Sequence, residues 1–140
     1  MIPFLDLRAA YLELKAQIDG SIDRVLNSGW YVLGPEVEAF ESEFADYCGV
    51  GHCVGLANGL DALTLALRAL DIGPGDEVIV PSNTYIATWL AVSAVGATPV
   101  PVEPNLATHN IDVRLIESAI TPQTRVILPV HLYGQPADLD

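Results

Sequence analysis

The sequence predicts an α/β protein built on a three-layer, doubly wound and mainly parallel sheet, with two helices leading into it. From residue 52 onwards, short runs rich in Val and Ile alternate with segments of helical periodicity, which is the order of β–α–β units. These runs are apolar at successive positions, as expected for strands covered on both faces of a parallel sheet. We therefore divide the chain into a helical segment, 1–50, and an α/β segment, 51–140.

The two leading helices are indicated by periodicity and by stop signals. Apolar residues recur at helical spacing from Tyr11 to Leu26, and Gly29 follows as a stop. A second helix is expected to begin at Pro35 and to end at Gly49. Its acidic face is interpreted as solvated. Its apolar side chains are expected to point inward, and they are Val37, Phe40, Phe44 and Tyr47.

Four strands and three crossover helices are expected in the α/β segment. In chain order they are strand 52–57, helix 58–70, strand 76–81, helix 84–95, strand 98–103, helix 112–120 and strand 125–130. The crossovers should be right-handed, and ligands of such sheets bind outside the carboxyl ends of the strands. Those ends carry Asn58–Gly59, Ser82–Tyr85, Glu103–Asn105 and His131–Tyr133.

Composition and charge narrow the range of functions. The 140 residues are 51% hydrophobic and 17% charged, so the chain can bury a sizeable core and is not expected to be disordered. The net charge is −12, and only six residues are Lys or Arg. Because neutralising phosphates requires clustered cations, this balance argues against a nucleic-acid partner.

The sequence also argues against secretion and membrane insertion. The start of the chain lacks a basic region followed by an apolar one, so no signal peptide is expected. The longest apolar tract, 85–102, is too interrupted by polar residues and prolines to span a membrane. Cys48 and Cys53 flank His52 at a spacing typical of no metal site, so we interpret both as core thiols in a reducing cytoplasm.

The stretch GLANGLDALTLALRAL, residues 55–70, joins a strand-like run directly to a helix. Asn58 is a good N-cap, and Gly59 has no Cβ that would keep a ligand away from the backbone N–H groups of the first turn. Such helix starts bind phosphate in α/β proteins, although an ordinary capped turn would use the same residues. Tyr85, at the next strand end, would place a flat aromatic ring beside a phosphate pocket, which suits a small phosphorylated ring.

Other chemistries are disfavoured because their motifs are absent from the 140 residues. The dinucleotide fingerprint G-x-G-x-x-G and the phosphate-binding loop G-x-x-x-x-G-K-[ST] do not occur. The G-x-S-x-G turn of serine hydrolases does not occur either.

Four stretches resemble the amino-terminal part of the DegT/DnrJ/EryC1/StrS family of sugar aminotransferases. They are SGWYVLGPEVEAFESEFADYCG, ANGLDALTLAL, GPGDEVIVPSNTYIATWLAVSAVGATPVPVEP and PVHLYGQPADLD, and the likeness covers essentially all 140 residues. These are pyridoxal-phosphate enzymes with the type I, aspartate aminotransferase fold, so residues 51–140 would be the first part of the cofactor-binding large domain. The sequence of these stretches most resembles that of 3-aminotransferases acting on dTDP-linked 3-keto-6-deoxyhexoses.

The resemblance implies roles for particular residues. Asn58, Gly59 and Leu60 would hold the cofactor phosphate, the last two through their backbone N–H groups, and Tyr85 would stack on the pyridine ring. The substrate side would be lined by Trp30, Tyr31, His131 and Tyr133. Alternatively, Trp30 and Tyr133 are core aromatics, and His131 is a histidine satisfied at a strand end.

The activity implied by the resemblance is transamination. Glutamate would convert pyridoxal 5'-phosphate to pyridoxamine 5'-phosphate, which then aminates the 3-keto carbon of a nucleotide-linked deoxysugar. The product would be an aminodeoxysugar for an antibiotic or a surface polysaccharide. A homodimer with a site completed across the interface is also implied, and a dianionic sugar nucleotide needs positive charge that these residues hardly supply.

The catalytic residues that the resemblance implies are expected beyond Asp140. They are the lysine that attaches the cofactor, the aspartate that pairs with the pyridinium nitrogen, and a phosphate-binding serine. Lys15, the one lysine in the sequence, is interpreted as a solvated surface lysine with an ordinary pKa. Two alternatives remain: a pyridoxamine-dependent sugar dehydratase with histidine in place of the lysine, and a non-catalytic α/β binding or dimerisation module.

Overall fold

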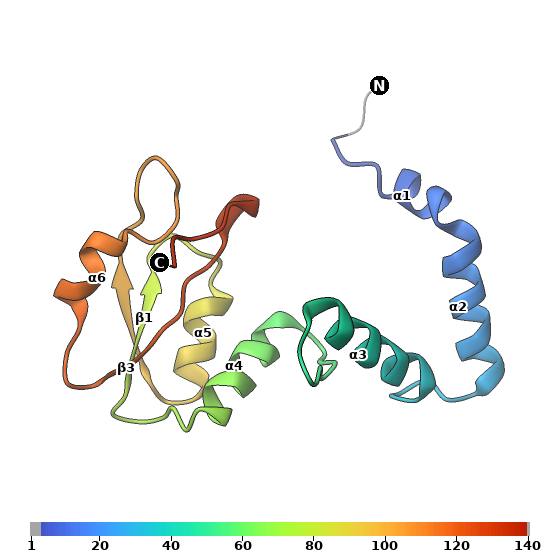
Figure 1. The fold of residues 1–140 in the computed structure, drawn as a ribbon, viewed down its shortest axis with the longest axis horizontal. Coiled ribbons are helices and arrows are strands. Elements are labelled where there is room, and N and C mark those ends of the chain that lie inside the picture. Colours follow the sequence, from blue (N-terminus) through green and yellow to red (C-terminus); the bar gives the residue numbers. More distant parts are fainter. Residues whose placement is uncertain (1–3, 140) are drawn as a thin grey trace. The chain divides into compact units, whose positions relative to one another are not determined.

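The computed structural model describes residues 4–139, and Figure 1 shows the chain as a ribbon. The chain divides into two compact units, Met1–Gly55 and Leu56–Asp140.

The first unit is helical, with α1 at Leu7–Glu13, α2 at Lys15–Ser28 and α3 at Pro35–Cys48. The expectation of two leading helices is therefore wrong, because the first is divided in two at Leu14, whose ψ is 11°. No proline or glycine marks this point in the sequence. The predicted ends are confirmed elsewhere, since α2 ends at a left-handed Gly29 and α3 at a left-handed Gly49.

The apolar face of α3 does not point into a core. Phe40, Phe44 and Tyr47 are all exposed, Phe44 by 46%. Their rings pack along the helix instead, with centroids 5.5 Å apart for Phe40 and Phe44. Cys48 is exposed and Cys53 is half-buried, and both are free thiols. The expectations of an inward aromatic face and of core thiols are wrong, because no layer of the unit covers these side chains among the described residues.

The second unit is a parallel sheet with helices on both faces (Figure 1). Its strands follow the order β2-β1-β3, and they are β1 at Glu77–Pro81, β2 at Thr98–Val102 and β3 at Thr124–Ile127. Its helices are α4 at Gly59–Ala69, α5 at Ala87–Ala94 and α6 at Val113–Ala119, and a 3₁₀ turn, η1, spans Leu132–Gly134. The expected alternation of strands and helices is confirmed for these elements.

One expected strand is absent. Residues 52–57 are not in a strand, because a strand requires a ladder of hydrogen bonds to a partner and the described residues offer none. The backbone N–H of Gly55 instead donates to a carboxylate oxygen of Glu41, at 2.7 Å. The four-strand expectation is corrected to three strands in the described part of the chain.

The core of the second unit lies on both sides of β1. Val78 and Val80 belong to an apolar cluster with residues of α4 and α5, including Leu67 and Val92. Ile79 belongs to a separate cluster, with Val102, Ile111 and residues of α6. Successive residues of a strand face opposite sides of the sheet, so these two clusters define the outer layers. The predicted three-layer α/β architecture is confirmed.

Candidate functional site

The loops that follow the three strands meet at one edge of the sheet, because parallel strands present their carboxyl ends on the same side. Asn83, after β1, donates from Nδ2 to the backbone oxygen of His109, in the loop after β2, at 2.9 Å. The ring of His109 meets that of Tyr133, after β3, edge to face, with centroids 6.0 Å apart. The edge predicted to hold the ligand is thus a connected set of loops.

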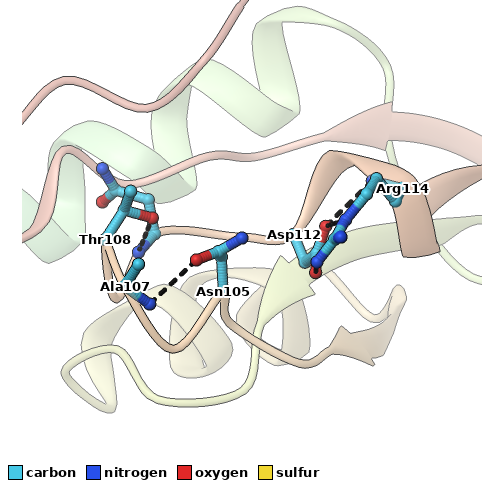
Figure 2. A network of polar contacts seen from close by, with 6 residues as sticks. Asn105, Ala107, Thr108, Asp112 and Arg114 are labelled. Atoms are coloured by element: carbon cyan, nitrogen blue, oxygen red, sulfur yellow. Dashed lines mark hydrogen bonds and ion pairs between the residues drawn. The ribbon is translucent and has the colours of Figure 1, made fainter.

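The loop after β2 is braced from within, as Figure 2 shows for its side chains. The backbone N–H of Ala107 donates to Oδ1 of Asn105 at 2.8 Å, and that of Asn110 donates to Oγ1 of Thr108 at 3.3 Å. Two backbone hydrogen bonds, from Asn105 to Asn110 and from His109 to Asn105, close the turn. His109 adopts a left-handed φ of 58° within it. This loop therefore has a defined shape.

Asn110 joins this loop to the segment after β3. Only 3% of Asn110 is exposed. Its Oδ1 accepts from the backbone N–H of Leu132 at 3.0 Å, and its Nδ2 donates to the backbone oxygens of Gln135 and Pro136 at 3.1 and 2.9 Å. The sequence analysis missed this residue, because the partners lie 22 to 26 positions away. Only the position of an Asn next to the apolar Ile111 could have drawn attention to it.

His131 and Tyr133 lie on this clamped segment. Nδ1 of His131 accepts a hydrogen bond from the backbone N–H of Ala137 at 2.9 Å. Tyr133 has a left-handed φ of 56° and is 82% exposed. The alternative that Tyr133 is a core aromatic is therefore wrong. For His131, the alternative was a histidine whose hydrogen bonds are satisfied at a strand end, and one of its two nitrogens does have a hydrogen-bond partner.

The first turn of α4 has the form predicted for it. Oδ1 of Asn58 accepts from the backbone N–H of Asp61 at 2.9 Å, and Nδ2 of Asn58 donates to the Asp61 carboxylate at 2.9 Å. Within residues 4–139 the N–H groups of Gly59 and Leu60 have no acceptor. A Cβ placed on Gly59 would meet no atom within 4 Å. This turn is therefore open to an anion, although the charge of Asp61 would partly oppose one.

Tyr85 lies just beyond the carboxyl end of β1. Its carbonyl oxygen accepts from the backbone N–H of Thr88 at 3.1 Å, close to the start of α5. The indole N–H of Trp89 donates to the carbonyl oxygen of Pro81 at 3.2 Å, which ties α5 to the end of β1. Tyr85 itself is 80% exposed, so its ring is accessible for stacking.

Trp30 and Tyr31 lie in the first unit, where they line a cavity of about 310 Å³. The Trp30 indole N–H donates to the carbonyl oxygen of Val32 at 2.8 Å. Its ring covers Gly34, where a Cβ would lie 3.3 Å from the ring. Trp30 is exposed, so the alternative that it is a core aromatic is wrong. Trp30 and Tyr31 belong to the first unit, and the other predicted site residues belong to the second.

A cavity of about 450 Å³ lies beside the predicted site rather than in it, lined by residues of the segments 105–114 and 135–138. None of the residues predicted to bind cofactor or substrate lines it. On its wall the guanidinium of Arg114 contacts the Asp112 carboxylate at 2.6 Å (Figure 2). This hydrogen bond lowers the pKa of Asp112 below its usual value.

Lys15 is a half-exposed surface residue that contacts the carboxylate of Asp19 and, at 2.9 Å, the hydroxyl of Tyr11. These hydrogen bonds raise the pKa of Lys15 above its usual range, so the expectation of an ordinary pKa is wrong. The ammonium form is the one held, and it is a poor nucleophile.

Residues 4–139 contain neither a candidate metal site nor a candidate membrane span. No group of three or more His, Cys, Asp or Glu side chains is placed to hold a metal ion in this part of the chain. No helix in it has the length and apolar character needed to cross a bilayer.

Comparison with known proteins identifies relatives along nearly the whole chain. It is 67% identical over 139 residues to a dTDP-3-amino-3,4,6-trideoxy-alpha-D-glucose transaminase of Streptomyces venezuelae, covering 99% of this chain and 37% of the relative. It is 66% identical over 139 residues to the erythromycin biosynthesis sensory transduction protein EryC1 of Saccharopolyspora erythraea, covering 99% of this chain and 38% of the relative. The chain thus spans well under half the length of these relatives.

The structure also superposes on a solved one. The crystal structure of S. venezuelae DesV in complex with a ketimine intermediate matches with a TM-score of 0.94 and 67% identity, over 99% of this chain and 37% of that chain. Residues 13–140 match the model of the DegT/DnrJ/EryC1/StrS aminotransferase family. The chain belongs to the DegT/DnrJ/EryC1/StrS aminotransferase family.

Proposed function

We propose that this chain is the amino-terminal part of a pyridoxal-phosphate-dependent aminotransferase. The substrate would be a dTDP-linked 3-keto-6-deoxyhexose, with glutamate as amino donor, in the biosynthesis of an aminodeoxysugar. The name of the S. venezuelae relative, a dTDP-3-amino-3,4,6-trideoxy-alpha-D-glucose transaminase, supports a dTDP-sugar substrate. Within this chain, the observation that carries the proposal is the open first turn of α4, at the start of a helix that packs against the sheet.

The residues present fit the phosphate of this cofactor. The free N–H groups of Gly59 and Leu60 point out of the helix start, and the absence of a Cβ on Gly59 allows a phosphate oxygen to approach them. Asn58 takes the N–H of Asp61 and so fixes the first turn. The side chain of Leu60 packs against the apolar core, which holds the turn in place.

When bound, pyridoxal phosphate supplies an electron sink for carbanion chemistry. The residues of this chain would hold and orient it. Tyr85 would cover one face of the pyridine ring and keep water from it. His131 and Tyr133, on the segment clamped by Asn110, would face the sugar substrate. Trp30 and Tyr31 are assigned to the substrate side by resemblance.

We also propose a homodimer, because the chain offers little free positive charge for a sugar nucleotide. Four of the six Lys and Arg side chains are already in ion pairs with carboxylates. Cations for a diphosphate would therefore have to come from other parts of the protein or from a partner subunit. The free thiols Cys48 and Cys53 are consistent with the cytoplasm as the location.

Two alternative functions predict different products. A pyridoxamine-dependent dehydratase of the same family would remove water from the sugar without transferring nitrogen. A non-catalytic binding or dimerisation module would do neither, and the name of EryC1, a sensory transduction protein, is in keeping with such a role.

The experiment uses a protein of the relatives' length that carries this chain. It is incubated with pyridoxal phosphate, ¹⁵N-glutamate and a dTDP-3-keto-6-deoxyhexose, and the sugar is analysed by mass spectrometry. We expect ¹⁵N in the sugar, with Tyr85→Phe close to wild type. Tyr85→Ala should weaken cofactor binding by roughly two- to twelvefold, since stacking contributes about 0.5–1.5 kcal/mol. Loss of water without ¹⁵N would identify a dehydratase, and an unchanged sugar would contradict both enzymatic proposals.

A further inference from the structure

One peptide group at the carboxyl edge of the sheet is held from both sides by side chains. Nδ2 of Asn110 donates to the carbonyl oxygen of Pro136 at 2.9 Å. The N–H of Ala137 donates to Nδ1 of His131 at 2.9 Å. That oxygen and that N–H belong to the same peptide group, and in a trans peptide they point in opposite directions. Asn110 and His131 therefore form hydrogen bonds to opposite edges of one planar peptide group.

Two of the residues that make these hydrogen bonds are buried, whereas Pro136 and His131 are exposed. Asn110 is 3% exposed and Ala137 is 6% exposed. Asn110 also accepts from the N–H of Leu132 and donates to the oxygen of Gln135. Only this orientation of its amide fits, because an N–H can only donate and a carbonyl oxygen can only accept. A chain of aligned hydrogen bonds strengthens each member.

This arrangement sets the tautomer of His131. A backbone N–H has no lone pair to offer, so Nδ1 must be the accepting, unprotonated nitrogen. In the neutral ring the proton is then on Nε2. His131 is exposed, so Nε2–H is a donor available at the edge where the ligand is proposed to bind.

The position of Asn110 is in turn fixed relative to the sheet. Asn83, two residues beyond β1, donates to the backbone oxygen of His109, the residue before Asn110. The backbone oxygen of Asn110 accepts from the N–H of Asn105 at 2.9 Å. The connection therefore runs from the end of the central strand, through Asn110 and one peptide group, to the imidazole of His131.

We propose that Asn110 is a positioning residue that acts through the Pro136–Ala137 peptide group. It holds His131 in the Nε2–H tautomer, so that this nitrogen donates a hydrogen bond to an acceptor oxygen of the bound sugar nucleotide. The identity of that ligand rests on the proposed function. The tautomer and its dependence on Asn110 do not.

The first test measures the tautomer in the full-length protein labelled with ¹⁵N-histidine, with His131→Gln used to assign the signal. We expect Nδ1 of His131 to resonate as an unprotonated nitrogen and Nε2 as a protonated one. Asn110→Asp keeps the acceptor for Leu132 but places an oxygen against the carbonyl of Pro136, so the two imidazole nitrogens should become averaged. Asn105→Asp is the matched control, because the Asn105 side chain only accepts, from Ala107, and should leave the signal unchanged.

Two results of this test would overturn the proposal. One is a wild-type His131 protonated at Nδ1, which needs no variant and decides the matter even if Asn110→Asp fails to fold. The other is an unaltered His131 signal in folded Asn110→Asp. Neither result depends on the enzyme being a sugar aminotransferase, so failure here is distinct from failure of the proposed function.

The second test measures whether Asn110 acts through His131 in the reaction. His131→Leu removes the donor and should raise KM for the sugar nucleotide by roughly tenfold, the loss of about one hydrogen bond, with a smaller change in kcat. Asn110→Asp should add little in the His131→Leu background. Additive losses in the double variant would show that Asn110 does not act through His131 and would overturn that part of the proposal.

Discussion

The two units of the chain have similar apolar content, but they bury their apolar side chains to very different extents. In the second unit, Val78, Ile79 and Val80 of β1 are fully buried, with helices on both faces of the sheet. In the described part of the first unit, Ala45 is the one buried apolar side chain, while Phe40, Phe44 and Tyr47 stay exposed. Helical periodicity is therefore enough to predict a helix, but burial requires a second layer that the periodicity does not identify.

The largest expected contrast is between the replacement of one apolar side chain by alanine in each unit. Ile79→Ala should lower the free energy of unfolding of the second unit by about 2–5 kcal/mol, because it leaves a cavity between sheet and α6. Phe44→Ala should lower that of the first unit by only about 1 kcal/mol, because its ring is already 46% exposed.

The two tryptophans allow each unit to be followed separately in the 140-residue chain, since Trp30 lies in the first unit and Trp89 in the second. Denaturant unfolding would be recorded for Ile79→Ala in a Trp30→Phe background, and for Phe44→Ala in a Trp89→Phe background. Equal losses for the two substitutions would contradict the contrast between the units.

A smaller contrast is expected between the helix caps. Asn58→Ala removes the acceptor for the Asp61 N–H and should cost the second unit about 1 kcal/mol. Asp6→Ala removes the acceptor for the N–H groups of Arg8 and Ala9 in α1. Asp6→Ala should make the backbone amides of α1 exchange hydrogen faster. The unfolding transition reported by Trp89 should not shift. A shift of the Trp89 transition in Asp6→Ala would show that the two units are coupled.

The smallest expected contrast is in acid. Hydrogen bonds to Arg114 and to Lys15 lower the pKa values of Asp112 in the second unit and Asp19 in the first, respectively. A lowered carboxyl pKa contributes stability that is complete above the usual value of 3.8 and is lost as the pH falls through the folded value. Asp112→Asn should therefore reduce the loss of stability in acid that Trp89 fluorescence reports. Asp19→Asn should reduce only the loss of stability in acid that Trp30 fluorescence reports. A loss of stability in acid that is unchanged in both variants would contradict this assignment.

Features set by neighbours in the sequence were predictable. The N-cap at Asn58, the strand at β1 and the glycine end of α3 follow from local chemistry, and the structure has them. Features set by distant partners were not. The strand expected at 52–57 lacks a partner among the described residues, and no local signal indicated the break at Leu14.

The same distinction, between features set by sequence neighbours and features set by distant partners, applies to the candidate site. Strand ends at the carboxyl edge could be located because parallel strands place them together. The clamp by Asn110 could not, because its hydrogen bonds reach from residue 110 to residues 132–136 and depend on the folded loops. Trp30 and Tyr31 were assigned by resemblance, and they belong to the helical first unit.

The central claim is that the first turn of α4 binds the cofactor phosphate through the N–H groups of Gly59 and Leu60. The most direct test is the affinity of the full-length protein for pyridoxal phosphate in Gly59→Val, with Gly51→Val as control. A Cβ at either glycine meets no atom within 4 Å, and neither has a positive φ, so both variants should fold.

We expect Gly59→Val to lower the affinity at least about tenfold, because its side chain would displace the phosphate from charge-assisted hydrogen bonds of about 1.5–3 kcal/mol each. Gly51→Val, in the first unit, should bind as wild type does. An unchanged affinity in a folded Gly59→Val protein would contradict the claim.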